Sequence, residues 1–140
     1  MRFVLDTNII VTAMRSPGGA SAALLMAARQ AKVRILANVA LALEYEATCN
    51  RAEHVVAAGL RPSQIVIFLD AVIAMAEPVE THFLWRPQLR DPADEMVLEA
   101  AVNGQASAIV TFNRQDFDGG ATKFGIEVLS PVDALRRIRP

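Results

Sequence analysis

The strongest constraint on the fold is a set of short apolar runs in which apolar and polar residues do not alternate. These runs lie at 2–5, 33–37, 108–111 and 126–129, and a further short strand is predicted at 79–81. A strand that is apolar at successive positions has both faces buried, which is typical of a parallel sheet covered by helices. Helix-forming segments separate the runs. The sequence therefore predicts an α/β fold, a three-layer α/β/α sandwich with a mainly parallel central sheet.

Helix start signals stand between the predicted strands. Residues 20–31 are rich in strong helix formers and follow the loop sequence Ser16-Pro17-Gly18-Gly19. The other start signals are Asn38, Arg61-Pro62-Ser63, Asp91-Pro92 and Ser130-Pro131. We expect a helix after each of them, the one after Asp91 running to about Val102, so that strands and helices alternate along the chain.

Length and composition favour a single globular domain over residues 1–140. Apolar residues make up 53% of the chain and charged residues 21%, which is unlike a disordered chain. The 14 basic and 15 acidic residues give a net charge of −1, which argues against a polybasic nucleic-acid binder. Cys49 is the only cysteine, so an internal disulfide is excluded. No apolar run resembles a signal peptide or a membrane span, and we expect a cytoplasmic protein without membrane contact.

Four acidic residues are predicted at one edge of the sheet. Asp6 ends the first strand, Asp116 follows the strand at 108–111, and Glu44 and Asp94 are expected in the first turns of helices entered from that edge. Carboxylates that converge repel one another unless a cation neutralises them, and oxygen ligands suit Mg²⁺ or Mn²⁺. Such a site favours phosphoryl hydrolysis by metal-activated water.

Each of these acids also has a purely structural interpretation. Asp6 could be a turn residue, Glu44 a solvated helix residue, Asp94 an acid stabilised at a helix N-terminus, and Asp116 the cap of a short turn. No single residue decides between the two interpretations, so their order and spacing must.

Four motifs, taken in order, resemble the PIN domain family. They span nearly the whole chain and read Val4-Leu5-Asp6-Thr7-Asn8, Leu43-Glu44-Tyr45, Arg90-Asp91-Pro92-Ala93-Asp94-Glu95 and Ile109-Val110-Thr111-Phe112-Asn113-Arg114-Gln115-Asp116-Phe117. The loop Ser16-Pro17-Gly18-Gly19 and the stretch Leu41-Ala42-Leu43-Glu44-Tyr45-Glu46 resemble the branch that contains VapC-like toxin components of bacterial toxin–antitoxin pairs. One such motif is weakly specific, whereas four in the family's order are specific.

The resemblance implies a ribonuclease that uses one or two Mg²⁺ or Mn²⁺ ions. Asp6, Glu44 and Asp94 match the family's first three acids. Many members carry an aspartate where this chain has Asn113, and others carry asparagine there with an aspartate three residues later. Asp116 is therefore the expected fourth acid, and Asn113 a supporting ligand or an orienter of bound water. The missing charge at 113 leaves one-metal and two-metal operation open. An RNA substrate, a cognate antitoxin lying across the site and a homodimer are also implied.

Further residues are expected to support this site. Hydrogen bonds that hold carboxylates or phosphate are expected from Thr7, Asn8 and Thr111. Phosphate contacts are expected from Arg15, Arg90 and Arg114, whose alternative is surface solvation. His54 and His82 are interpreted as structural or surface residues, and Trp85 as a packing residue or a platform for a base.

Other functions are open or disfavoured. A catalytically degenerate PIN-like module used for protein binding predicts a partner complex without hydrolysis. A haloacid-dehalogenase-like phosphatase needs an aspartate where this chain has Asn8, and a receiver domain needs paired acids near the first strand, so both are disfavoured. Self-association is expected through the apolar faces of residues 20–31 or 64–76.

Overall fold

The computed structural model describes residues 1–82 and 88–138 of the chain. Its elements, in chain order, are β1 (Arg2–Leu5), α1 (Thr7–Arg15), α2 (Ala20–Arg29), β2 (Arg34–Ala37), α3 (Val39–Cys49), α4 (Ala52–Ala58), α5 (Pro62–Met75), β3 (Ala76–Pro78), α6 (Pro92–Asn103), β4 (Ala108–Val110), the 3₁₀ helix η1 (Arg114–Asp116), α7 (Asp118–Thr122), β5 (Glu127–Leu129) and α8 (Pro131–Ile138).

The strands of the described residues form one sheet of five, in the order β3-β2-β1-β4-β5, and every neighbouring pair is parallel. β1 is central, since Val4 pairs with Leu36 of β2 on one side and with Ile109 of β4 on the other. These three residues are fully buried, which explains why the runs do not alternate with polar residues. The predicted α/β fold with a parallel central sheet is confirmed.

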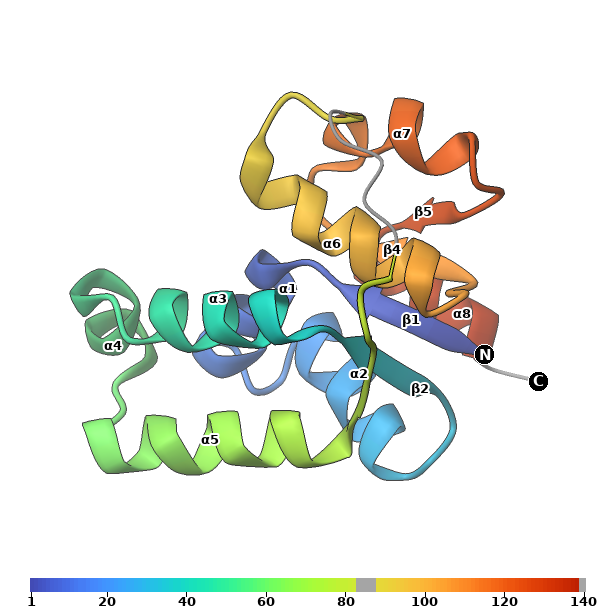
Figure 1. Ribbon diagram of the computed structural model, residues 1–140. Coiled ribbons are helices and arrows are strands. Elements are labelled where there is room, and N and C mark those ends of the chain that lie inside the picture. Colours follow the sequence, from blue (N-terminus) through green and yellow to red (C-terminus); the bar gives the residue numbers. More distant parts are fainter. Residues whose placement is uncertain (83–87, 139–140) are drawn as a thin grey trace.

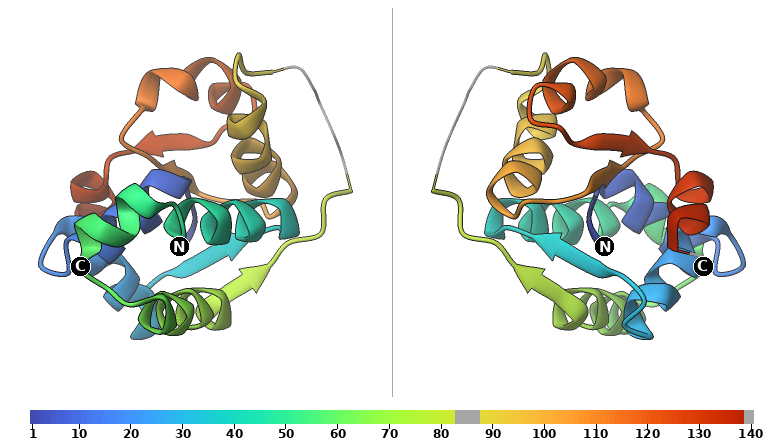
Figure 2. Two further views of the ribbon diagram at one scale, coloured as in Figure 1. Left: turned by 90° about the vertical axis from the view of Figure 1, so that its left-hand side faces the viewer. Right: turned by 90° about the vertical axis from the view of Figure 1, so that its right-hand side faces the viewer.

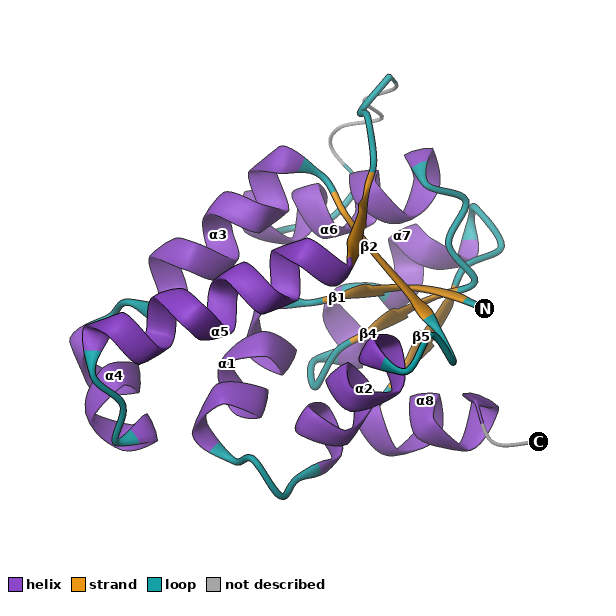
Figure 3. Ribbon diagram, turned by 90° about the horizontal axis from the view of Figure 1, so that it is seen from below, coloured by secondary structure: helices purple, strands orange, loops and turns teal. Residues whose placement is uncertain are grey.

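Helices cover both faces of the sheet. α6 packs against β1, β2 and β4, and α7 against β5; Figure 1 shows both above the sheet. α2 lies below the sheet in that view and packs against α8, which also contacts β5. The side views in Figure 2 show the sheet between the two layers, and Figure 3 views it from below, with α2 and α8 in front of the strands. α3 packs against both α1 and α6, so these three helices surround the end of β1.

Two buried polar side chains tie α3 to its surroundings at this end of the sheet. The Asn38 side chain caps α3, because its Oδ1 accepts a hydrogen bond from the Leu41 N–H at 2.8 Å, as the sequence predicts. Its Nδ2 donates to the Met96 carbonyl of α6 at 3.2 Å. Tyr45 is fully buried, and its hydroxyl donates to the carbonyl oxygen of Leu5. The last residue of β1 is thereby fixed against α3.

The sequence analysis does not predict α1, which begins immediately after β1. Residues 9–11 are the β-branched run Ile9-Ile10-Val11, a composition that favours strands, and all three are buried in α1. Burial of this face against the core outweighs the local preference. The short helices α4 and α7 are also absent from the sequence analysis, which finds no start signal for either.

The strand predicted at 79–81 is wrong by three residues. β3 runs over Ala76–Pro78 and begins where α5 ends, with Ala76 opposite Ile35 and Pro78 opposite Ala37. Pro78 is tolerated because β3 is an edge strand, and the Val79 N–H still donates to the Ala37 carbonyl at 2.9 Å. Pro78 is thus the last residue of β3.

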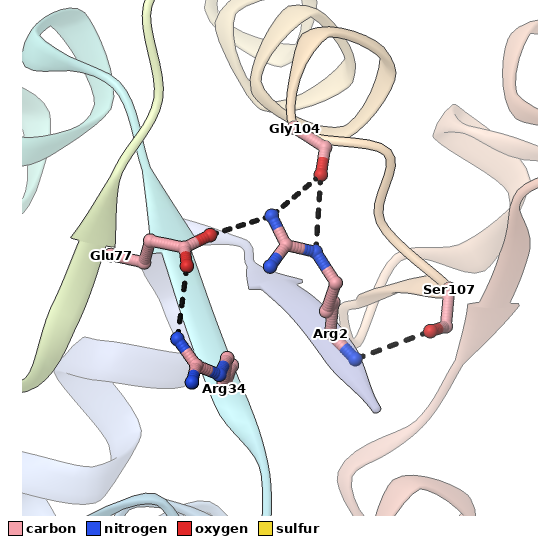
Figure 4. A network of polar contacts seen from close by, with 5 residues as sticks. All are labelled: Arg2, Arg34, Glu77, Gly104 and Ser107. Carbon is pink, nitrogen blue, oxygen red and sulfur yellow. Dashed lines mark hydrogen bonds and ion pairs between the residues drawn. The ribbon is translucent and has the colours of Figure 1, made fainter.

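A polar network braces the opposite edge, where the strands begin (Figure 4). The Arg2 guanidinium donates to the Gly104 carbonyl at 2.9 and 3.2 Å and forms an ion pair with Glu77 at 2.6 Å. Arg34 reaches the second oxygen of Glu77 at 3.1 Å, and Ser107 Oγ accepts from the Arg2 N–H. The hydrogen bond from Arg2 and the charges of both arginines lower the pKa of Glu77. This network joins β1, β2, β3 and the end of α6.

A bilayer-spanning helix is not found among the described residues. None is long and apolar enough by itself, and only the bent pairs α1–α2 and α4–α5 meet the length and composition criteria together.

Candidate functional site

Asp6 lies where β1 and β4 end side by side. Its N–H donates to the Val110 carbonyl at 2.9 Å, which fixes the backbone of Asp6 against β4. Both carboxylate oxygens accept hydrogen bonds: Oδ1 from the Thr7 N–H at 2.8 Å and Oδ2 from the Thr111 hydroxyl at 2.7 Å. The first of these bonds caps α1. Asp6 is therefore both a helix cap and a fixed, largely buried carboxylate at the sheet edge.

Burial raises the pKa of Asp6 above its usual value. The hydrogen bonds from Thr111 and Thr7 oppose this effect, while the nearby charges of Asp116 and Asp91 add to it. The expected hydrogen-bonding role of Thr7 and Thr111 toward a carboxylate thus has a structural counterpart, although Thr7 uses its backbone N–H. Thr111 also accepts from the Asn113 N–H at 3.0 Å, so one hydroxyl links Asp6 to the segment after β4.

Asp94 occupies the first turn of α6, as the sequence predicts. Asp91 caps this helix, with its Oδ1 accepting from the Ala93 N–H at 2.9 Å, and Pro92 is the first helical residue. Burial raises the pKa of Asp94 to about 6, and the charges of Asp6, Asp91, Asp116 and Glu95 contribute to the rise. The four acids are hence close enough to oppose the ionisation of Asp94.

Glu44 lies in the second turn of α3, one turn later than the sequence analysis expects. Its half-buried carboxylate accepts a hydrogen bond from the Thr48 hydroxyl at 3.1 Å, one helical turn away. The helix begins at Val39, as its Asn38 start signal predicts, so Glu44 is its sixth residue and the expectation of the first turn is wrong. Glu44 nevertheless lines the same pocket as Asp6, which directly follows β1.

Two adjoining hollows share Asp94. The first, about 240 Å³, is the acidic pocket, and it is lined by Asp6, Thr7, Asn8, Val11, Glu44, Thr48, Arg51, His54, Ala93, Asp94 and Asn113. The second, about 490 Å³, is lined by Gln88, Leu89, Arg90, Asp91, Asp94, Gln115, Asp116, Gly119 and Gly120. The structure thus brings three of the four expected acids into one pocket together with Asn113, and places Asp116 in the adjoining hollow.

The donor chemistry of the acidic pocket fits a hard divalent cation. Burial raises the pKa of Asp6 and of Asp94, and the charge of Asp6 adds to the rise at Asp94, so a bound cation would stabilise the ionised carboxylates. The Asn8 Oδ1 atom is buried there and has no hydrogen-bond partner within residues 1–82 and 88–138. Within the same residues, however, no three His, Cys, Asp or Glu side chains form a group that could hold a metal ion. The acids share a pocket without forming a closed ligand set.

The three expected phosphate-binding arginines lie in three different places. Arg15 contacts His54 Nδ1 at 3.2 Å, and Arg90 lines the hollow that contains Asp116. Arg114 lines a separate hollow of about 550 Å³ beside β5 and α8. Of the three arginines, only Arg90 lines one of the two hollows that contain the expected acids.

Arg51 and His54 line the acidic pocket, and sequence reasoning missed both as site residues. The interpretation of His54 as a structural or surface residue follows from its position outside the motifs, whereas in the structure it is a lining residue of the pocket, contributed by α4. His82 is exposed, in agreement with the sequence analysis. The prediction for Trp85 lies outside the described residues.

Glu95 is a further residue to which the sequence analysis assigned no role. Its buried carboxylate accepts hydrogen bonds from the N–H groups of Gln88 and Leu89, at 2.6 and 2.8 Å, and so holds the segment that carries Arg90 and Asp91. Acidic residues are common in the first turn of a helix, so the sequence does not mark Glu95 as special. Only its burial in the structure distinguishes it from the exposed Asp91.

Comparison with known proteins connects this site to a described family. A family model described as PIN domain matches residues 2–115, a span that includes Asp6, Glu44 and Asp94 and ends just before Asp116. Comparison with curated proteins gives no match. Among solved structures, VapBC2 from Rickettsia felis bound to a DNA fragment from their promoter superimposes with a TM-score of 0.62 at 16% identity, covering 93% of this chain and 98% of that chain. At this identity the likeness concerns the fold alone.

Proposed function

Because the chain belongs to the PIN domain family, we propose that it is a metal-dependent endoribonuclease, the toxin of a toxin–antitoxin pair. The observation that carries the proposal is the acidic pocket, where Asp6, Glu44 and Asp94 from three different elements meet at the end of the sheet. The raised pKa values of Asp6 and Asp94 add support, because strongly perturbed acids gathered in a pocket are typical of catalytic sites.

Asp6, Glu44 and Asp94 are proposed to hold one or two Mg²⁺ or Mn²⁺ ions, with Asp116 as a fourth acid reached through the adjoining hollow. When bound, such an ion supplies an activated water and stabilises charge on the phosphate oxygens during hydrolysis of an RNA phosphodiester. Thr111 and the Thr7 N–H keep the Asp6 carboxylate in one orientation. Asn8 and Asn113 offer neutral side-chain oxygens to a ligand or to bound water, and Arg90 offers a cation to a phosphate at the adjoining hollow.

The proposed partners follow from the family and from the fold. The similar Rickettsia felis structure is a VapBC2 complex bound to promoter DNA. By analogy, a cognate antitoxin is proposed to bind this chain and cover the acidic pocket. A homodimer and a cytoplasmic location are proposed alongside it.

The test is metal-dependent cleavage of a panel of transfer RNA, ribosomal RNA fragments and messenger RNA. Wild type, Asp6→Asn and Asp94→Asn are compared in Mn²⁺ and in EDTA, with Asp70→Asn as the control because Asp70 is exposed on α5. We expect cleavage by wild type and by the control in Mn²⁺ only, and loss of at least about 100-fold in the two pocket variants. Equal cleavage by wild type and Asp6→Asn would reject the proposed site.

A binding-only protein is the second candidate. It is favoured by the lack of a closed three-residue metal group in the described residues and by Asn113, where many family members carry an aspartate. It predicts a stable partner complex and no Mn²⁺-dependent cleavage by wild type of any RNA in the panel.

A further inference from the structure

The acidic pocket is not uniformly acidic. Asp6, Glu44 and Asp94 line it together with two nitrogen donors, Arg51 and His54. Both donors come from the connection between α3 and α4: Arg51 precedes the first residue of α4, and His54 lies within it. A pocket of this kind presents acceptor oxygens and cationic or N–H donors to the same small volume, which suits a ligand containing both a cation and an anion.

The Arg51 guanidinium is available for a ligand. It forms no ion pair or hydrogen bond with any residue of the described segments, and its side chain is exposed. Glu44, an acid of the same pocket, accepts its hydrogen bond from Thr48 instead. The positive charge at Arg51 therefore does not serve to neutralise a particular carboxylate of the fold.

The His54 ring is fixed by Arg15. Arginine has only donors, so the contact of 3.2 Å between Arg15 Nη1 and His54 Nδ1 requires a lone pair on Nδ1. The proton of the neutral ring is then on Nε2, which makes Nε2 a donor. The carboxylate oxygen Oε1 of Glu53 lies 3.7 Å from Nε2, which is too long for a hydrogen bond. The side chain is only 18% exposed, so its orientation is restrained by packing.

We propose that Arg51 and His54, which line the acidic pocket together with its carboxylates, bind a phosphate group of the substrate strand. This inference rests on the proposed ribonuclease function and adds its phosphate-positioning residues. An RNA strand entering a pocket of three carboxylates meets repulsion, and a guanidinium with an N–H donor offsets it at the phosphate oxygens. Arg15 acts through His54, because it selects the tautomer that donates from Nε2.

The test measures RNA affinity separately from cleavage. Single-stranded RNA carrying a fluorophore is titrated with protein by anisotropy, between about 50 and 200 mM salt, so that affinity and salt dependence are both obtained. All variants carry Asp94→Asn, which keeps the RNA intact. The variants are Arg51→Gln, His54→Leu and His54→Gln, and the matched controls are Arg29→Gln and His82→Leu, which alter exposed residues outside the pocket. Thermal unfolding confirms that each variant is folded.

We expect Arg51→Gln to weaken RNA binding about tenfold and to reduce the salt slope by about one. We expect His54→Leu to weaken it about fivefold and His54→Gln to retain most of the affinity, because glutamine keeps an N–H donor near the Nε2 position. Affinities equal to the parent for Arg51→Gln and His54→Leu would overturn the inference. So would an equal loss with Arg29→Gln, or no RNA binding by the parent.

The two proposals fail in distinguishable ways. RNA binding that depends on Arg51, combined with no Mn²⁺-dependent cleavage by wild type, rejects the nuclease and retains phosphate binding by Arg51 and His54. Cleavage that is lost with Asp6→Asn but unaffected by Arg51→Gln and His54→Leu rejects phosphate binding by Arg51 and His54 and retains the nuclease.

Discussion

Asp6 combines two demands that ordinarily fall on different residues. It caps α1 through Oδ1 and receives the Thr111 hydroxyl on Oδ2, and it is also part of the acidic pocket. Asparagine at this position preserves the size and one acceptor oxygen, so Asp6→Asn removes the charge with little change in shape. Loss of activity in that variant would therefore report on charge at the site, since the cap is largely kept.

Burial of Asp94, to which the charges of neighbouring acids add, disfavours its ionised form, and we predict that Asp94→Asn stabilises the metal-free protein. Its folded-state pKa of about 6 exceeds the usual value near 3.8, so ionisation of Asp94 disfavours the fold at neutral pH. The penalty is absent well below pH 4, grows as the pH rises through the window between these values, and is complete above about 6. We expect the melting temperature in EDTA to rise by about 2–4 °C at pH 7.5.

The measurement is differential scanning calorimetry of wild type and Asp94→Asn in EDTA at pH 4.5 and pH 7.5. The difference in melting temperature should shrink at the lower pH, where wild-type Asp94 becomes protonated. Asp70→Asn is the control, since Asp70 is exposed. A stabilisation of the same size at both pH values would contradict the proposed electrostatic origin.

Among the elements, α6 organises the site from both ends. Its first turn carries Asp94. At its other end, the Gly104 carbonyl accepts a hydrogen bond from Arg2, which also forms an ion pair with Glu77 at the opposite edge of the sheet (Figure 4). Near its start, Glu95 holds the segment before the helix by two backbone hydrogen bonds. The position of Asp94 in the acidic pocket therefore depends on contacts at both ends of α6.

We predict that Glu95→Ala destabilises the fold by about 2–3 kcal/mol, because the N–H groups of Gln88 and Leu89 lose their shared acceptor. Urea unfolding measures the loss, and hydrogen exchange should show faster exchange of these two amides. The exposed Glu46 on α3 provides the control, Glu46→Ala. Unchanged protection of the Gln88 and Leu89 amides in Glu95→Ala would show that other contacts hold this segment.

At the scale of the whole molecule, α5 exposes apolar side chains that a small domain ordinarily covers. Val66, Ile67 and Ile73 are 53%, 68% and 43% exposed. Residues 64–76, one of the two segments expected to self-associate, thus present three large exposed apolar side chains, whereas residues 20–31 present one, Met26. The two hollows that contain the acids do not include these α5 residues.

We predict that the wild-type protein dimerises through α5 and that Ile67→Lys makes it monomeric. Val56→Lys is the control, because Val56 is an exposed apolar residue on α4 outside the proposed interface. Analytical ultracentrifugation at tens of micromolar should give a dimer for wild type and for the control, and a monomer for Ile67→Lys. A wild-type monomer at that concentration would contradict the dimer.

Local signals in the sequence predicted much of this architecture, and the structure confirms them. The caps Asn38 and Asp91 form the expected hydrogen bonds, and the apolar runs at 2–5 and 108–111 are adjacent strands whose ends lie together. Capping and burial on both faces are properties of a few consecutive residues. They can therefore be recognised from residue type and order, and so can the family to which the chain belongs.

Tertiary packing decided what such local signals do not contain. Ile9 and Ile10 lie in a helix because the core receives that face of α1, and β3 lies three residues earlier than predicted because it pairs with β2 directly after α5. Asp116 lines a different hollow from Asp6, and Arg51 joins the acidic pocket without belonging to any motif. These placements depend on how distant segments pack against one another. The sequence by itself determined the buried strands, the helices with a start signal and the order of the acids along the chain, and the tertiary structure decided the remaining elements and which side chains share a pocket.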